Sequence, residues 1–150
     1  MNVYFEVIMS NKWKNLNIKP NQQEMYNIAM RARYNIWSRT KSGRDYLGYP
    51  FAPYSEKYRL IREKLHKTTE TVNLEFTNRM LSSIQIASRP TESYIYFADA
   101  NRRKIAYYHN IGEGRLPRRE FFALSSQDNE ELAKYLFSQI EKRIMKWRID

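Results

Sequence analysis

The C-terminal part of the chain carries an apolar repeat that an α-helix places on a single face. The apolar positions are Leu132, Leu136, Ile140, Ile144 and Trp147. Acidic residues from Asp128 to Glu131 precede the repeat and basic residues from Lys142 to Arg148 end it, which matches the helix dipole. We expect a helix that opens at Ser125 or Ser126 and runs nearly to the C-terminus.

A second amphipathic helix is predicted near the N-terminus. Asn21 and Glu24 have the spacing of a capping box, directly after Pro20. The apolar side chains that follow at helical spacing are Met25, Ile28, Ala29, Ala32 and Ile36. This helix should run to about Arg39.

Alternating apolar residues predict four strands. Residues 3–8 have the period of a half-buried strand, and residues 84–87 and 94–98 alternate on either side of the polar segment SRPTES. We interpret these last two as a hairpin. Residues 119–124 are expected to form another strand, and residues 72–76 are expected to be extended.

Two shorter helices are predicted between these elements. Ser55 caps the first, on which Tyr54, Tyr58, Ile61 and Leu65 share a face. Thr77 is expected to cap the second, through Ile84.

The segment 101–109 fits either a third short helix or another strand. Helical spacing and the stop signal at Gly112 favour the helix. The loop from Lys41 to Pro53 is rich in glycine, proline and aromatic residues and is expected to pack against the domain.

Together these elements predict one α+β domain over residues 1–150. A chain of 150 residues with 42% hydrophobic residues is large enough for one core. We expect a small, mostly antiparallel sheet of about four strands, packed against the N-terminal and C-terminal amphipathic helices.

Composition limits the classes of function. The chain has no cysteine, which excludes disulfides and thiolate chemistry, and its opening MNVYFEVIM carries no basic leader. No stretch is apolar enough to suggest a membrane span. The formal charge of +10 favours polyanionic partners, although excess charge can also simply keep a tyrosine-rich protein soluble.

Residues suited to catalysis are few. The two histidines, His66 and His109, lie in no metal-binding pattern, and no acidic residue lies near His109 in sequence. We interpret His66 as a solvated helix end and His109 as a structural histidine bonded to the following loop. GEGR at 112–115 lacks the phosphate-binding loop pattern. The sequence therefore predicts a non-enzymatic protein without catalytic residues, metal or cofactor.

Basic residues concentrate in two stretches that also hold aromatic residues. The candidate DNA-facing side chains are Arg31, Arg33, Arg102, Arg103 and Lys104. Charge and stacking of this kind suit a phosphate backbone, but no known nucleic-acid-binding motif accompanies them, and a solvated surface explains them equally.

Three blocks of the sequence resemble the virion-morphogenesis and tail-completion families of tailed phages, which include Mu G-like proteins and tail-to-head joining proteins. The first block is Phe51, Pro53, Tyr54, Ser55 and Tyr58; the second is Val72, Asn73, Leu74, Thr77 and Met80; the third is His109, Gly112, Pro117, Arg119, Phe121 and Phe122. The resemblance covers residues 36–148. Asn78 stands where the family has a glycine, and asparagine tolerates the left-handed conformation better than most residues.

The resemblance implies a structural subunit, commonly of a hexameric ring, at the virion neck. Its neighbours would be the head connector or head-completion protein and the tail terminator or tube, with genomic DNA in the lumen. The expected contact residues are Arg44, Tyr46, Tyr49, Phe51, Arg115, Arg118 and Arg119. The alternative from the residues alone is a small basic nucleic-acid-binding protein of the cytoplasm.

Overall fold

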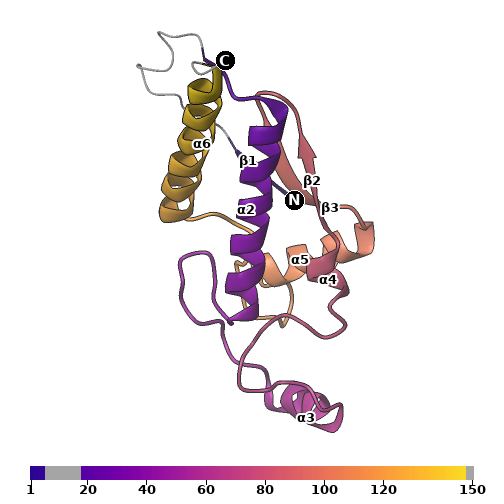
Figure 1. Cartoon of the computed structure of the whole chain (residues 1–150). Helices are drawn as coiled ribbons and strands as arrows, with labels where there is room; N and C mark the ends of the chain where they lie inside the picture. The colour runs from indigo at the N-terminus through magenta and orange to yellow at the C-terminus, as the bar shows by residue number, and fades with distance from the viewer. Residues whose placement is uncertain (6–17, 148–150) are drawn as a thin grey trace.

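The computed structural model describes residues 1–5 and 18–147 and has an α+β architecture (Figure 1). Its antiparallel sheet contains β1 (Asn2–Phe5), β2 (Ile84–Ser88) and β3 (Ser93–Phe97) in the order β1-β3-β2. The predicted hairpin is confirmed, because β2 and β3 are neighbours in the sheet. The expected continuation of the first strand to residue 8 lies outside the described residues.

The helices follow the start signals in the sequence closely. They are α2 (Gln22–Lys41), α3 (Glu56–Lys64), α4 (Arg79–Ser82), α5 (Ala100–Ile111) and α6 (Ser126–Trp147). The predicted capping box is present at α2, where the Asn21 side chain accepts from the Glu24 amide at 2.8 Å and the Glu24 carboxylate accepts from the Asn21 amide at 2.9 Å. The helical interpretation of 101–109 is confirmed by α5.

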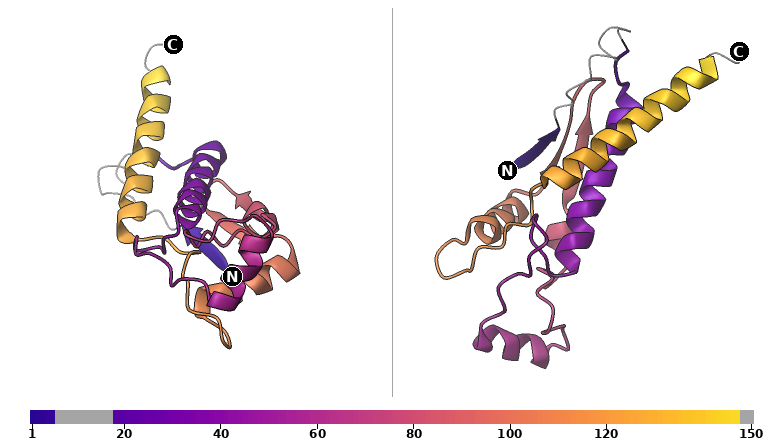
Figure 2. Two further views of the ribbon diagram at one scale, coloured as in Figure 1. Left: turned by 90° about the horizontal axis from the view of Figure 1, so that it is seen from below. Right: turned by 90° about the vertical axis from the view of Figure 1, so that its left-hand side faces the viewer.

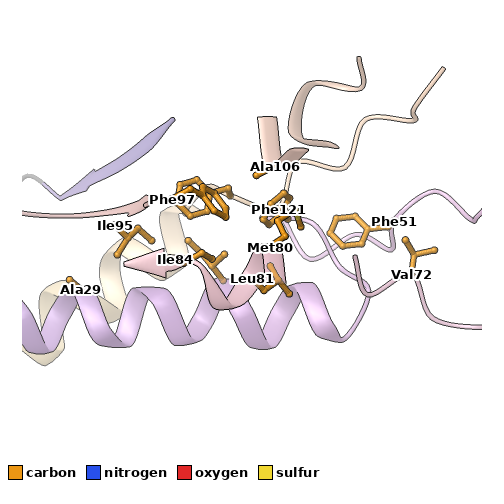
Figure 3. Close-up of a cluster of buried hydrophobic side chains, with 12 residues drawn as sticks. Ala29, Phe51, Val72, Met80, Leu81, Ile84, Ile95, Phe97, Ala106 and Phe121 are labelled. Carbon is orange, nitrogen blue, oxygen red and sulfur yellow. The ribbon is translucent and has the colours of Figure 1, made fainter. Parts of the chain in front are cut away.

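Helix α2 lies between the sheet and α6, so it is buried on two sides (Figure 1). Ala29 and Ile36 face the sheet and join a core that contains Ile84, Ile95 and Phe97 (Figure 3). A second cluster on another face consists of Met25, Ile28, Ala32, Leu132, Leu136 and Ile140. The last helix is expected to pack on the sheet, and this expectation is wrong. The buried apolar residues of α6 pack against α2 instead.

Two arginine–carboxylate pairs hold the antiparallel helices α2 and α6 at both ends. Near the end of α2, Arg39 lies 2.7 Å from Asp128 in the first turn of α6. Near its start, Glu24 lies 2.7 Å from Arg143 in the last turns of α6. Burial would raise the pKa of Asp128, but hydrogen bonds from Ser125 and Arg39, with the charge of Arg39, lower it below its usual value.

The expected strand at 119–124 is not formed, and the described residues contain three strands instead of about four. The backbone of this segment is bonded to the end of α5: the Arg119 amide donates to the His109 carbonyl at 2.8 Å and the Phe122 amide to the Asn110 side chain at 2.9 Å. Phe121 and Phe122 are nevertheless buried, and the ring centroid of Phe122 lies 4.7 Å from that of Phe97. The segment thus serves as core without joining the sheet.

The segment 72–78 also differs from the prediction. Leu74 has a φ of 53°, so the segment is not a continuous extended strand. Asn78, and not Thr77, occupies the N-cap of α4, with a φ of 58°. Asn78 therefore adopts the left-handed conformation, which asparagine tolerates better than most residues.

Residues 53–71, which we call the arm, extend from one end of the molecule and carry α3 (Figures 1 and 2). The buried side chain of α3 is Arg62, whereas Leu60, Ile61 and Leu65 are exposed. Of the face expected on this helix, Tyr54 and Tyr58 are half-buried against Arg62, whereas Ile61 and Leu65 are exposed.

Candidate functional site: an arginine-rich cavity

A cavity of about 580 Å³ lies between the arm, α4, α5 and the loop after α5. Its walls are largely apolar, with Leu74, Phe76, Met80, Ile105 and Leu116 among them. The basic side chains that line it are Arg62, Arg102, Arg115, Arg119 and His109. No aspartate or glutamate of the described residues lines it.

Arg119 is a buried cation that connects the body to the arm. Its guanidinium donates to the Ala52 carbonyl at 3.1 and 2.8 Å and to the Pro53 carbonyl at 3.1 Å. Within the described chain, the Arg119 guanidinium therefore bonds to backbone carbonyls and pairs with no carboxylate. Burial lowers the pKa of Arg119, against the opposing influence of Tyr54 and Tyr58.

Arg62 organises the arm in a similar way. Its side chain is 1% exposed, and it donates to the Thr68 carbonyl at 2.7 Å, the Glu75 carbonyl at 3.2 Å and the Asn73 side chain at 3.4 Å. The returning chain of the arm is thus wrapped around one guanidinium. A buried charge is tolerated when its donors are satisfied in this manner.

Tyr54 lies next to both buried cations. The guanidinium carbon of Arg62 lies 4.6 Å from the Tyr54 ring centroid, and that of Arg119 lies 5.5 Å from it. Cation–π contact is stronger when the cation is desolvated, and both arginines are buried. Burial raises the pKa of Tyr54, although the charge of Arg62 opposes this rise.

Two further arginines line the cavity nearer to solvent. Arg102 is half-buried on α5 and Arg115 is exposed in the following loop. Neither side chain takes part in an ion pair within residues 1–5 and 18–147. Their donors are therefore available to a ligand.

Gly112 brings the loop that carries Arg115 and Arg119 against the end of α5. It has a φ of 75°, and a Cβ there would lie 2.7 Å from the Arg118 amide nitrogen. Both the left-handed conformation and the close approach require glycine.

His109 lines the same cavity with an unsatisfied ring nitrogen. Its Nδ1 is buried and has no hydrogen-bond partner among the residues that the structure describes. Burial, and secondly the charge of Arg119, lower the pKa of His109 to about 4, so the ring is neutral at pH 7. The expected bond to the following loop is made by the His109 backbone carbonyl and not by the side chain. Among the described residues that line the cavity, there is no carboxylate to orient this histidine.

The structure separates the predicted contact residues into two groups. Arg44, Tyr49, Arg115 and Arg118 are exposed and Tyr46 is half-buried, so these side chains are at the surface. Phe51, at 8% exposed, and Arg119, at 4%, are buried within the chain. These two were wrongly assigned to a surface contact, because their burial completes the core and holds the arm.

The candidate DNA-facing residues do not form one cluster. Arg31, on α2, lies 4.7 Å from the ring centroid of Tyr135 on α6, and Arg33 is half-buried on α2. Arg102 lines the cavity on α5, where Arg103 and Lys104 are exposed. The structure instead brings together Arg102 and Arg115, which the sequence had assigned to different roles.

Sequence reasoning missed Arg62 as a site residue. It follows Tyr54 and Tyr58 at intervals of four residues, so the three share one helical stripe. An arginine in line with two aromatic residues can indicate a buried cation. The sequence analysis instead took Ile61 and Leu65 as part of the buried face, so Arg62 was not recognised.

Among the described residues, no helix is long and apolar enough to cross a membrane. In the same residues, no group of three metal-ligating side chains is close enough to hold an ion. No protein-family model, curated protein or solved structure matches the chain.

The neighbouring residues Arg118 and Arg119 provide a matched test of the buried cation. Arg119→Gln should lower the free energy of unfolding by roughly 3 kcal/mol, because two buried carbonyls lose a charged donor. Arg118→Gln should cost less than about 1 kcal/mol, since its pair with Glu120 is at the surface. Urea denaturation of both variants measures the difference, and equal losses would contradict the proposed role of Arg119.

His109 should make stability depend on pH. The folded-state pKa of about 4 is below the ordinary value of 6.5, so the unfolded chain binds a proton first as the pH falls. The stability should therefore be complete above about pH 6.5 and fall by up to about 3 kcal/mol towards pH 4.

Denaturation curves at several pH values measure the free energy of unfolding of the wild-type protein and of His109→Gln. The replacement should remove the pH dependence that His109 causes. The same replacement at the exposed His66 should leave it in place. A wild-type protein whose pH dependence equals that of His109→Gln would show that His109 is not buried in its neutral form.

Proposed function

We propose that this chain is a structural subunit of a tailed-bacteriophage virion, in a ring at the neck that completes the tail and joins it to the head connector. The proposal rests first on the resemblance of its three sequence blocks to tail-completion proteins. It implies no catalytic step and no cofactor.

The observation that carries the proposal is that the three blocks meet around one cavity. The cavity-lining residues from the blocks are Tyr54, Ser55 and Tyr58; Leu74, Thr77 and Met80; and His109, Pro117 and Arg119. Chance similarity in short motifs gives no reason for such convergence. The left-handed Asn78 adds support, since the one departure from the pattern keeps the backbone conformation that glycine favours.

The arm supports assembly with neighbouring copies. Leu60 and Ile61 on α3 and Leu65 directly after it are 47%, 41% and 51% exposed, on a segment that extends from the body (Figure 2). An exposed apolar group on a projecting segment is suited to a partner surface. In a ring, each subunit offers one surface to the next, so an arm on one copy and the body of its neighbour form a heterologous contact.

A second exposed surface lies at the loop 43–50. Asp45 orders this loop by accepting from the Leu47 and Tyr49 amides, each at 2.9 Å, and Leu47 and Tyr49 are 57% and 65% exposed at its tip. The Tyr46 amide donates to the Glu120 carbonyl at 3.0 Å, and Glu120 also pairs with Arg118, so the loop contacts the segment that carries Arg118. We assign Arg44, Tyr46, Tyr49 and Arg118 to the contact with the head connector or the tail.

A free nucleic-acid-binding protein is the weaker alternative. Its basic residues would be expected to form one stripe, whereas Arg31 and Arg102 line separate hollows. Contact with DNA in a ring lumen needs only charge and no such stripe.

Charge reversal at the loop surface tests the proposal without touching the cavity. Arg44→Glu combined with Arg118→Glu should leave the fold intact, because both side chains are exposed. In a phage that lacks the native gene, this double variant should yield heads and tails that remain separate. Electron microscopy of the lysate counts joined particles.

The matched control is Arg89→Glu combined with Lys134→Glu, two exposed positions outside this surface. It should restore joined particles. Normal joining with the Arg44 and Arg118 variant, after thermal melting has shown it to be folded, would remove this loop surface from the head–tail contact.

A further inference from the structure

The cavity beside the arm contains more positive charge than its own chain neutralises. Four arginines line it, and none of the four takes part in an ion pair among the described residues. The acidic side chains nearby have other partners: Glu120 pairs with Arg118, and Glu75 with Lys41. An anion would therefore find an attractive field at a site that no carboxylate of the described chain occupies.

The arginines divide into two kinds. Arg62 and Arg119 are buried and donate mainly to backbone carbonyls, so they contribute charge from below the cavity surface. Within the described residues, the side chains of Arg102 and Arg115 form no ion pair, so each can offer paired N–H donors to a ligand. A planar guanidinium fork binds carboxylate and phosphate oxygens in two parallel hydrogen bonds.

The rest of the lining selects for an apolar group. Leu74, Phe76, Ile105 and Leu116 form walls beside the charged side chains. A volume of about 580 Å³ falls within the range of small-molecule sites, which measure roughly 300 to 1,000 Å³.

We propose that this cavity binds a small organic anion, a carboxylate or phosphate attached to an apolar group, through Arg102 and Arg115. The site does not depend on the ring proposal and adds a binding activity to it. The apolar group lies against the walls while the anionic group meets the arginine side chains, and the buried cations strengthen the attraction.

The fluorescent anion 1-anilinonaphthalene-8-sulfonate tests the site on the full chain, with neutral N-phenyl-1-naphthylamine as its uncharged counterpart. Arg102→Gln combined with Arg115→Gln should weaken binding of the anion about tenfold, because charge-assisted hydrogen bonds are lost. Binding of the neutral probe should not change.

The control variant is Arg103→Gln combined with Lys104→Gln, which removes the same charge from exposed positions on α5. It should change the anion's affinity less than about threefold, since screened surface charge contributes little. An equal loss in both double variants would reduce the effect to net charge and overturn the proposal.

Displacement of the dye identifies the anionic group. Phenyl phosphate and 3-phenylpropionate share an apolar ring, so the better competitor shows whether phosphate or carboxylate is preferred. If neither displaces the dye at millimolar concentration, the proposal is wrong.

Amide NMR spectra of the wild-type protein locate the site without relying on a variant's stability. Shifts on addition of the better competitor should concentrate in residues 54–58, 102–109 and 115–119. Shifts confined to α2 and α6 would overturn the assignment. None of these outcomes bears on head–tail joining, so the ring proposal can fail or succeed separately.

Discussion

Helix α2 must bury two faces at once, and the arrangement of the other elements follows from this constraint. Ala29 and Ile36 complete the core against the sheet, while Met25 and Ala32 pack against α6. A three-stranded sheet alone offers little buried area, so the helix provides the surface on which both layers are assembled (Figure 1). The arginine–carboxylate pairs at either end fix the position of α6 along α2, which apolar contacts alone define less sharply.

The arm is held by a different interaction, in which buried cations replace an apolar core. Arg119 reaches from the body to the carbonyls at the start of the arm, and Arg62 gathers the returning chain. Both lie against Tyr54. This arrangement leaves the apolar residues of α3 exposed and places positive charge under the adjoining cavity. The two buried arginines therefore account both for the exposed apolar surface of the arm and for the positive charge at the proposed anion site.

Local signals in the sequence predicted the parts of the fold that depend on neighbouring residues. The Asn21 capping box, the stripe through Leu136 and the stop at Gly112 each act within a few positions, and each was correct. The segment 119–124 was misread because its apolar residues fit a strand, while its backbone bonds to the distant end of α5. The burial of Arg119 was missed for the same reason: its carbonyl partners lie far away in sequence, where no periodicity reveals them.

In the proposed neck ring, neighbouring proteins cover the exposed arm and the loop 43–50. Quantitative mass spectrometry of purified phage particles tests this ring most directly, with copies of this chain counted against the major capsid protein. A closed neck ring predicts about six or about twelve copies in each particle. Absence of the chain from mature particles, while infected cells still produce it, would contradict the claim and favour a protein that acts outside the virion.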